Sequence, residues 1–188
     1  MEIIFATSNH GKALEAAKVL EKFNVKVKHK KMSIIELDLD SIEEISVEKA
    51  KSAFKKIKKP LIVEDTGVYL SAFPGFPGVV SKKVMKALRV KGFIKLLKGE
   101  KNRKMEFNTV FTFIWGKNKF KVFDSSIHGN VPFKPKGNSH KQLLYDSMFV
   151  PKRFTKTFAE MTVEEKNKLS ARGKALEKLG RWLKNERK

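Results

Sequence analysis

The stretch LIVEDTGVYLSAFPGFPGVVSKK, residues 61–83, joins a short apolar run to two adjacent acids, Glu64 and Asp65. A segment broken by glycine and proline follows, and the stretch ends in two lysines. The apolar run predicts a buried strand, and Pro60 is tolerated at the start of one. Two carboxylates beside a core are costly unless cations or a metal ion neutralise them. The stretch therefore predicts an α/β fold with a charged site at the end of a buried strand.

The two acids suit metal-assisted chemistry if the chain turns directly after them. Adjacent strand residues point to opposite faces, so both acids can serve one site only if the strand ends there, which Thr66–Gly67 permits. Oxygen ligands in such a place suit Mg²⁺, which keeps several waters and also binds phosphate oxygens. One carboxylate could hold the metal while the other takes a proton from an attacking water. The alternative is that Asp65 only caps a turn or a short helix.

The composition points to an anionic partner. The chain has 188 residues, with 41 Lys and Arg against 20 Asp and Glu, a net charge of +21 that attracts nucleotides or nucleic acid. The alternative is a solvated lysine-rich surface of the kind found in heat-adapted proteins. No run approaches the roughly 20 apolar residues that cross a bilayer, and there is no signal-peptide pattern and no cysteine. We therefore expect a cytoplasmic protein of one domain, without membrane contact.

Strand-like and helix-like patterns alternate along the chain. Residues 2–6 form an apolar run, and from 12 to 23 an apolar stripe of Leu14, Ala17, Leu20 and Phe23 predicts an amphipathic helix. Further expected elements are an exposed strand at 24–30, a helix at 42–57, a loop at 73–78, helices around 81–98, a hairpin of 105–115 and 119–129, a short helix capped by Thr162 and Glu165, and a last helix from Ser170.

Three other places could contact anions or metal. The segment FATSNHGK, residues 5–12, places Asn9 where it can cap a helix whose backbone N–H groups, with Lys12, form an anion site. Glu36 could add a third carboxylate, and Lys166 and Arg172 stand near helix starts. The alternatives are an ordinary strand–turn–helix, solvated acids and surface cations. No pattern of a covalent nucleophile is present.

Four segments, taken together and in this order, resemble the inosine triphosphate pyrophosphatase family. They are FATSNHGK (5–12), IVEDTGVYLSAFPGFPGVVSK (62–82), YDSMFVP (145–151) and TFAEMTVEEKNKLSARGKAL (157–176). The resemblance covers nearly the whole chain, residues 1–188. It implies a two-lobed α/β domain around a long mixed β-sheet, a homodimer, and an active site in the cleft between the lobes. It also implies Mg²⁺-dependent hydrolysis of non-standard purine nucleoside triphosphates, such as ITP, XTP and dITP, to monophosphate and pyrophosphate.

The same resemblance implies roles for individual residues. The family segment T-[GS]-N-x-x-K, which contacts the triphosphate, corresponds to Thr7, Ser8, Asn9 and Lys12. The acidic pair corresponds to Glu64 and Asp65 as metal ligands, with Asp65 also the base or water activator, and a further metal ligand corresponds to Glu36. Phosphate-binding lysines correspond to Lys49, Lys82 and Lys166, the base pocket to Tyr145 and Asp146, and the arginine of the S-H-R motif to Arg172.

Two departures from the family pattern affect the base pocket. Leu143–Leu144 replaces Phe-Gly before Tyr-Asp, and Ala171 replaces the histidine before the arginine. A lost aromatic stack is worth on the order of 1–3 kcal/mol. We therefore expect relaxed or altered base specificity. The alternatives are a diphosphatase shifted to a pyrimidine or modified triphosphate, and a catalytically weakened relative that binds nucleic acid through its positive charge.

Overall fold

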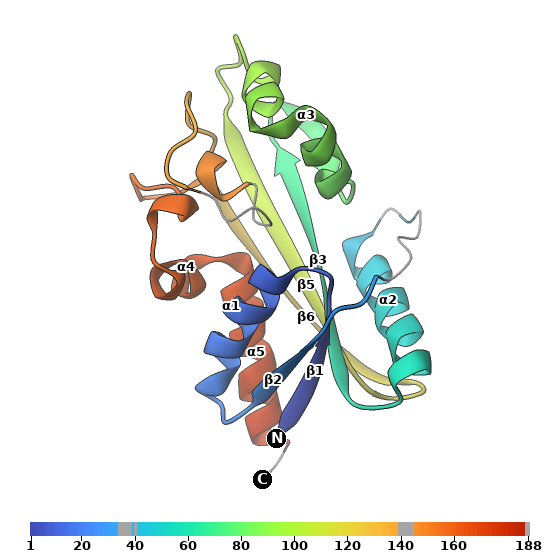
Figure 1. Ribbon diagram of the computed structural model, residues 1–188. Coiled ribbons are helices and arrows are strands. Elements are labelled where there is room, and N and C mark those ends of the chain that lie inside the picture. Colours follow the sequence, from blue (N-terminus) through green and yellow to red (C-terminus); the bar gives the residue numbers. More distant parts are fainter. Residues whose placement is uncertain (34–38, 40, 139–144, 187–188) are drawn as a thin grey trace. The chain divides into compact units, whose positions relative to one another are not determined.

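The computed structural model describes residues 1–33, 39, 41–138 and 145–186, and its backbone divides into two compact units. Unit 1 comprises Met1–Asp65, Thr109–Ser125 and Ala171–Lys188, and unit 2 comprises Thr66–Asn108 and Ser126–Ser170. Strands run in the order β2-β1-β3-β5-β6-β7 in one mixed sheet, with β4 paired to β3 (Figure 1). The expected α/β fold with a mixed sheet is confirmed. Glu36 and Leu143–Leu144 lie outside the described residues.

Three strands, β3 (Leu61–Leu70), β5 (Lys104–Gly116) and β6 (Lys119–Asn130), contribute residues to both units. Unit 1 adds β1 (Glu2–Ala6), α1 (His10–Glu21), β2 (Lys26–Lys30), α2 (Ile42–Ile57) and α5 (Ala171–Asn185). Unit 2 adds β4 (Phe73–Gly78), α3 (Ser81–Leu96), the short 3₁₀ turns η1 (Asp146–Met148) and η2 (Phe158–Glu160), β7 (Val150–Pro151) and α4 (Val163–Leu169). No described helix is both long and apolar enough to cross a membrane.

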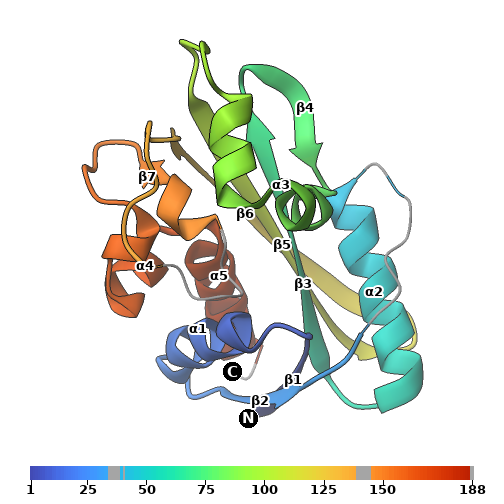
Figure 2. The same ribbon diagram turned by 45° about the horizontal axis from the view of Figure 1, so that its top comes forward.

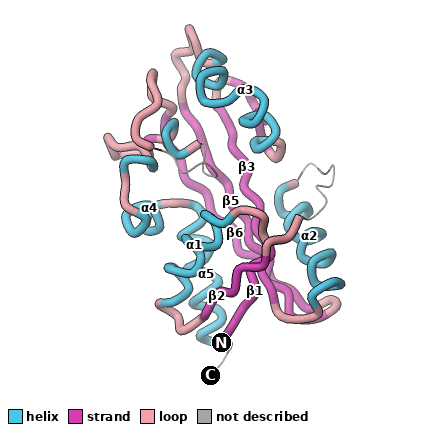
Figure 3. Tube along the Cα trace, viewed as in Figure 1, coloured by secondary structure: helices cyan, strands magenta, loops and turns pink. Residues whose placement is uncertain are grey.

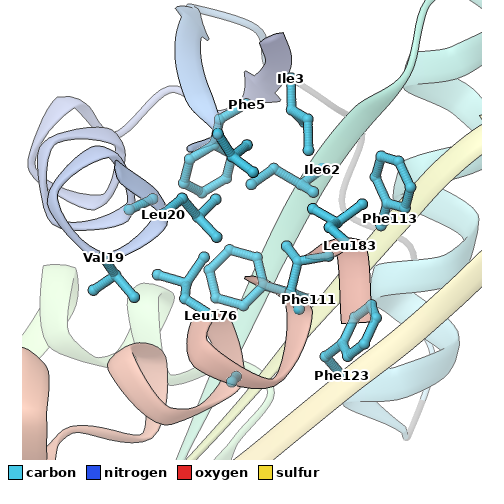
Figure 4. Close-up of a cluster of buried hydrophobic side chains, with 14 of the residues drawn as sticks. Ile3, Phe5, Val19, Leu20, Ile62, Phe111, Phe113, Phe123, Leu176 and Leu183 are labelled. Carbon is cyan, nitrogen blue, oxygen red and sulfur yellow. The ribbon is translucent and has the colours of Figure 1, made fainter. Parts of the chain in front are cut away.

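In unit 1 the strands β1, β3 and β5 bury residues on both faces, because helices cover each face, whereas β2 is largely exposed. Figure 3 shows α1 and α5 on one side of these strands and α2 on the other. Because alternate residues point to opposite sides of a strand, Phe5 and Ile62 pack with α1 and α5 (Figure 4), whereas Leu61 and Val63 pack with α2. The helix expected at 12–23 is confirmed as α1, and its expected apolar stripe is confirmed at Leu20 but wrong at Leu14. Leu14 is 51% exposed, and the buried positions are Gly11, Ala13, Glu15, Ala16, Val19 and Leu20.

In unit 2 a second apolar cluster includes Met85 and Phe93 of α3 and Phe149. The helix α3 is two helical pieces, because Arg89 has a φ of 54° (Figure 2). The loop expected at 73–78 is wrong: this segment is strand β4, which pairs antiparallel with β3. Proline is compatible with an edge strand, since a missing N–H on the open side removes no ladder bond. The proline and glycine content of residues 73–78 therefore predicted a loop where the chain forms a strand.

Candidate active site

The turn after β1 is built by its own side chains. The backbone N–H of Asn9 donates to Thr7 Oγ1 at 3.1 Å, and the N–H of Lys12 donates to Asn9 Oδ1 at 3.1 Å. His29 Nε2 lies 2.9 Å from the carbonyl oxygen of Thr7, which ties the turn to the end of β2. Asn9 thus caps α1 as expected. Ser8 is exposed beside it, and the start of a helix is a favourable place for a phosphate.

Glu64 and Asp65 point to opposite faces of β3, and the strand does not end at them. It continues to Leu70, so the expected turn at Thr66–Gly67 is wrong. The neighbouring strand ends instead: β1 pairs with β3 at Phe5–Ile62 and stops at Ala6. Both acids therefore follow the position where β1 leaves the sheet and its turn begins. The end of a neighbouring parallel strand, not of β3 itself, places both carboxylates near Lys12.

Glu64 belongs to a buried cluster of charges on the face covered by α1 and α5. Arg172 donates from Nε to Glu64 Oε2 at 2.9 Å and from Nη2 to Glu64 Oε1 at 3.1 Å. Its Nη1 donates to Glu15 Oε2 at 2.5 Å, and Lys12 Nζ lies 3.0 Å from Glu64 Oε1. Burial opposes the charge of Arg172, but the two carboxylates outweigh burial and raise its pKa. The cluster balances two cations against two anions, so it can remain buried.

Asp65 lies on the face covered by α2, where Lys49 donates to its Oδ1 at 2.5 Å. Burial raises the pKa of Asp65 above its usual value, although Lys49 and then Lys12 lower it, and Glu64 adds to the rise. The other oxygen, Oδ2, is buried and has no hydrogen-bond partner among the described residues. One oxygen of Asp65 is thus held by a cation, and the second is available for a ligand or a proton.

The donor set fits a Mg²⁺ ion that keeps much of its water shell. No group of three or more His, Cys, Asp or Glu side chains that could hold a metal occurs in the described ranges. Asp65 Oδ2 is an acceptor without a partner among the described residues, whereas Glu64 Oε1 already contacts Arg172 and Lys12, and Glu64 Oε2 accepts from Arg172. Magnesium takes one or two carboxylates and completes its octahedron with water and phosphate oxygens. The open oxygen of Asp65, beside a phosphate-binding turn, is therefore enough for a first protein ligand of such an ion.

The other expected site residues lie in unit 2, where they contact one another. Lys166 Nζ is 2.5 Å from Asp146 Oδ2, and both side chains are mostly buried. The hydroxyl of Tyr145 donates to the carbonyl oxygen of Ser81 at 2.8 Å, and burial raises the pKa of Tyr145. Lys82, next to Ser81 at the start of α3, is exposed. The capping box of Thr162 and Glu165, which begins the helix carrying Lys166, is confirmed.

Glu15 is the charged residue that the sequence analysis missed. It is 4% exposed and contacts Arg172, which is 157 positions away in the chain. A signal was present: Gly11, Glu15 and Val19 are spaced four apart, and all three are buried on one face of α1. A carboxylate at a buried helical position needs a cation, and that requirement indicates a buried ion pair.

Comparison with known proteins places the chain in a family. The model of the Ham1 family matches residues 3–182. The chain belongs to the Ham1 family. This Ham1 protein is 39% identical over 188 residues to a dITP/XTP pyrophosphatase of Thermococcus kodakarensis, with 100% of both chains covered. It is 38% identical over 185 residues to a dITP/XTP pyrophosphatase of Methanopyrus kandleri, which covers 98% of this chain and 97% of the relative.

Solved structures agree with the fold of this Ham1 protein. The structure of a HAM1 protein from Coxiella burnetii superposes with a TM-score of 0.84 at 25% identity, covering 98% of this chain and 99% of that one. The resemblance to the pyrophosphatase family, read from four short segments, is thereby confirmed over nearly the full chain.

Proposed function

We propose that this Ham1 protein is a nucleoside triphosphate diphosphatase, a hydrolase of acid anhydrides that acts on non-standard purine nucleotides such as ITP, XTP and dITP. The products are the nucleoside monophosphate and pyrophosphate, and the role is removal of damaged nucleotides from the pool. The observation that carries the proposal is Asp65, with one oxygen held by Lys49 and the other buried without a partner. The substrate class is supported by relatives named dITP/XTP pyrophosphatase.

The proposed reaction uses Asp65 as the proton acceptor. The oxygen of a water attacks the α-phosphorus, Asp65 Oδ2 takes the proton of that water, and the bond to the bridging oxygen breaks, so that pyrophosphate leaves. The raised pKa of Asp65 makes its carboxylate a better base than an exposed aspartate. The triphosphate is held by the turn Thr7, Ser8 and Asn9 and by Lys12 and Lys49, whose ammonium groups each have three donors and can share them between carboxylate and phosphate.

Magnesium is the proposed cofactor. Asp65 and Glu64 would hold it, and Glu36 is the third ligand that the family resemblance suggests. When bound, the ion supplies positive charge that neutralises phosphate oxygens and favours departure of pyrophosphate. Arg172 and Glu15 contribute by holding the carboxylate of Glu64 in one orientation, because Arg172 contacts both of its oxygens. This support of a first ligand by a second residue is common around metal sites.

Roles for the unit 2 residues and for Arg172 in nucleotide binding are part of the proposal. Lys82 and Lys166 bind phosphate oxygens, and Tyr145 and Asp146 bind the nucleoside. The pair of Lys166 and Asp146 supports this assignment, since the cation holds the carboxylate in a defined position. For Arg172, which the family pattern places near the base, the contacts with Glu64 favour a positioning role in addition.

The deciding experiment measures pyrophosphate release from ITP, XTP, dITP, ATP, GTP, CTP and UTP, with Mg²⁺ and with a chelator. The wild type should act only with the metal ion. Asp65→Asn should abolish turnover and retain nucleotide binding, whereas Asp124→Asn, at an exposed acid of unit 1, should behave like the wild type. Normal turnover by Asp65→Asn would remove the catalytic assignment, and no release from any nucleotide would refute the function.

The same panel tests base specificity. Because Leu143 and Ala171 replace the family's aromatic ring and histidine, we propose that ITP and XTP are favoured over ATP and GTP less strongly than the family pattern implies. A preference for a pyrimidine triphosphate would identify a shifted substrate. A strong preference for ITP and XTP would mean that other side chains recognise the 6-keto group.

Dimerisation and a cytoplasmic location complete the proposal; the dimer rests on the family resemblance, and the location fits a chain without cysteine. Light scattering should give twice the 21.5 kDa mass of one chain. A mass of one chain at micromolar concentration would contradict the dimer.

A further inference from the structure

Positive charge is concentrated in one segment of unit 2. Residues 81–104, the basic segment, contain ten Lys and Arg against one Glu, a net charge of +9 out of +21 for the whole chain. All but one of these ten cations are exposed; the buried one is Arg103. Ion-paired surface helices usually alternate the two signs, and this segment does not. A net charge of +9 over 24 residues attracts a polyanion.

Two of these lysines, Lys91 and Lys95, lie on one face of the second piece of α3, and Lys98 lies in the turn that follows this helix. Lys91, Lys95 and Lys98 follow one another at spacings of four and three, and the spacing of four corresponds to about 6 Å along a helix. None of the three has a carboxylate within ion-pair distance in the described part of the chain. The face therefore presents a row of unneutralised cations to solvent.

An exposed aromatic ring is attached to the end of this row. Phe133 is 81% exposed, the largest exposure among the large apolar side chains of the described residues. The guanidinium of Arg103 lies 4.7 Å from the centre of its ring. Arg103 also donates to the carbonyl oxygens of Leu97 at 2.8 Å and Val131 at 2.9 Å, so it joins the end of α3 to the segment bearing Phe133. The Arg103 guanidinium thus lies over one face of the Phe133 ring, and most of the ring stays exposed to solvent.

We propose that this surface, made by Lys91, Lys95, Lys98 and Phe133, binds single-stranded nucleic acid. The lysines contact successive phosphates, and an unpaired base stacks on the ring of Phe133. An exposed aromatic beside a cationic row is the arrangement that proteins use for single strands, since every base offers a stacking face. A duplex hides those faces. An anionic membrane fits less well, because Met85 and Phe93 of α3 are buried in the core, and Leu88 and Leu96 of the same helix are each only 37% exposed.

The test measures anisotropy of a fluorescent dT20 oligonucleotide over a series of salt concentrations. Each phosphate contact adds about 0.7 to the slope of log Kd against log salt. The triple variant Lys91→Gln, Lys95→Gln, Lys98→Gln removes three contacts and should therefore reduce this slope by roughly 2. The matched control is Lys55→Gln, Lys56→Gln, Lys59→Gln, which removes the same charge from exposed positions of unit 1. It should change the slope much less.

A second pair of variants tests the ring. Phe133→Ala should weaken dT20 binding roughly 5- to 150-fold, the range expected for one stacked base. Phe154→Ala, at another exposed phenylalanine of unit 2, should leave binding unchanged. Circular dichroism and pyrophosphate release check that each variant is folded.

Any one of several outcomes would overturn the proposal. They are no binding of dT20 at low salt, equal losses in the two triple variants, equal behaviour of the two phenylalanine variants, and binding to phosphatidylserine vesicles but not to dT20. Tighter binding of a duplex than of dT20 would also contradict it, because stacking on Phe133 would then have no role.

Discussion

Replacing Arg172 with methionine tests the buried charge cluster around Glu64. The guanidinium makes three charge-assisted hydrogen bonds, two to Glu64 and one to Glu15. Methionine fills a similar volume but removes the guanidinium from both buried carboxylates, and Glu64 keeps its contact with Lys12. Breaking a buried pair by removing one partner costs about 3–5 kcal/mol, because a buried charge is left uncompensated. For a chain of this size, that loss corresponds to a fall in Tm of roughly 6–20 °C.

The measurement is thermal and urea unfolding followed by circular dichroism, with Arg181→Met as the control. Arg181 lies on the same helix, but it is 74% exposed and 3.8 Å from Glu177, so its loss should cost at most about 1 kcal/mol. Adding Glu15→Gln to Arg172→Met should recover part of the stability, because one of the two buried negative charges that lost the guanidinium is then removed.

Two results would refute this reasoning. One is a loss below about 1 kcal/mol for Arg172→Met, equal to that of Arg181→Met, since the cluster would then contribute nothing measurable. The other is a Glu15→Gln change that destabilises both backgrounds equally, which would show no coupling between the two side chains. Loss of turnover without loss of stability would instead place the role of Arg172 on the substrate.

Lys49→Gln should move the acidic limb of the pH profile of kcat/KM to higher pH. Lys49 lowers the pKa of Asp65, so without it the carboxylate is protonated at a higher pH and the base is lost earlier as the pH falls. The control is Lys51→Gln, because Lys51 is near Lys49 in sequence but is paired with Glu48, and it should leave the acidic limb in place. An acidic limb that moves in neither variant would contradict the assignment of Asp65 as the base. Gly180→Ala should destabilise the fold by about 1–3 kcal/mol, because an added Cβ would lie 2.2 Å from the ring of Phe23. Urea unfolding measures this, and an unchanged midpoint would show that the ring moves freely.

Much of the local structure could be predicted from short patterns. The cap at Asn9, the box at Thr162 and Glu165, and the hairpin around residues 117–118 depend on neighbours within a few positions, and all are present. The strand β4 could not be predicted, since its proline and glycine content is typical of a loop. Residues 73–78 form a strand because they pair with the edge of β3, a contact that short sequence patterns do not reveal.

The sequence by itself determined the alternation of strands and helices, the family, and the residues around which a site could form, because these follow from local spacing and side-chain chemistry. Only the tertiary structure decided which charges meet. Glu64 contacts Arg172 across 108 positions, while its neighbour Asp65 contacts Lys49 on the other face of β3. The physical reason is that a strand sends adjacent side chains to opposite faces, and the packing of α1, α5 and α2 on those faces selects each partner.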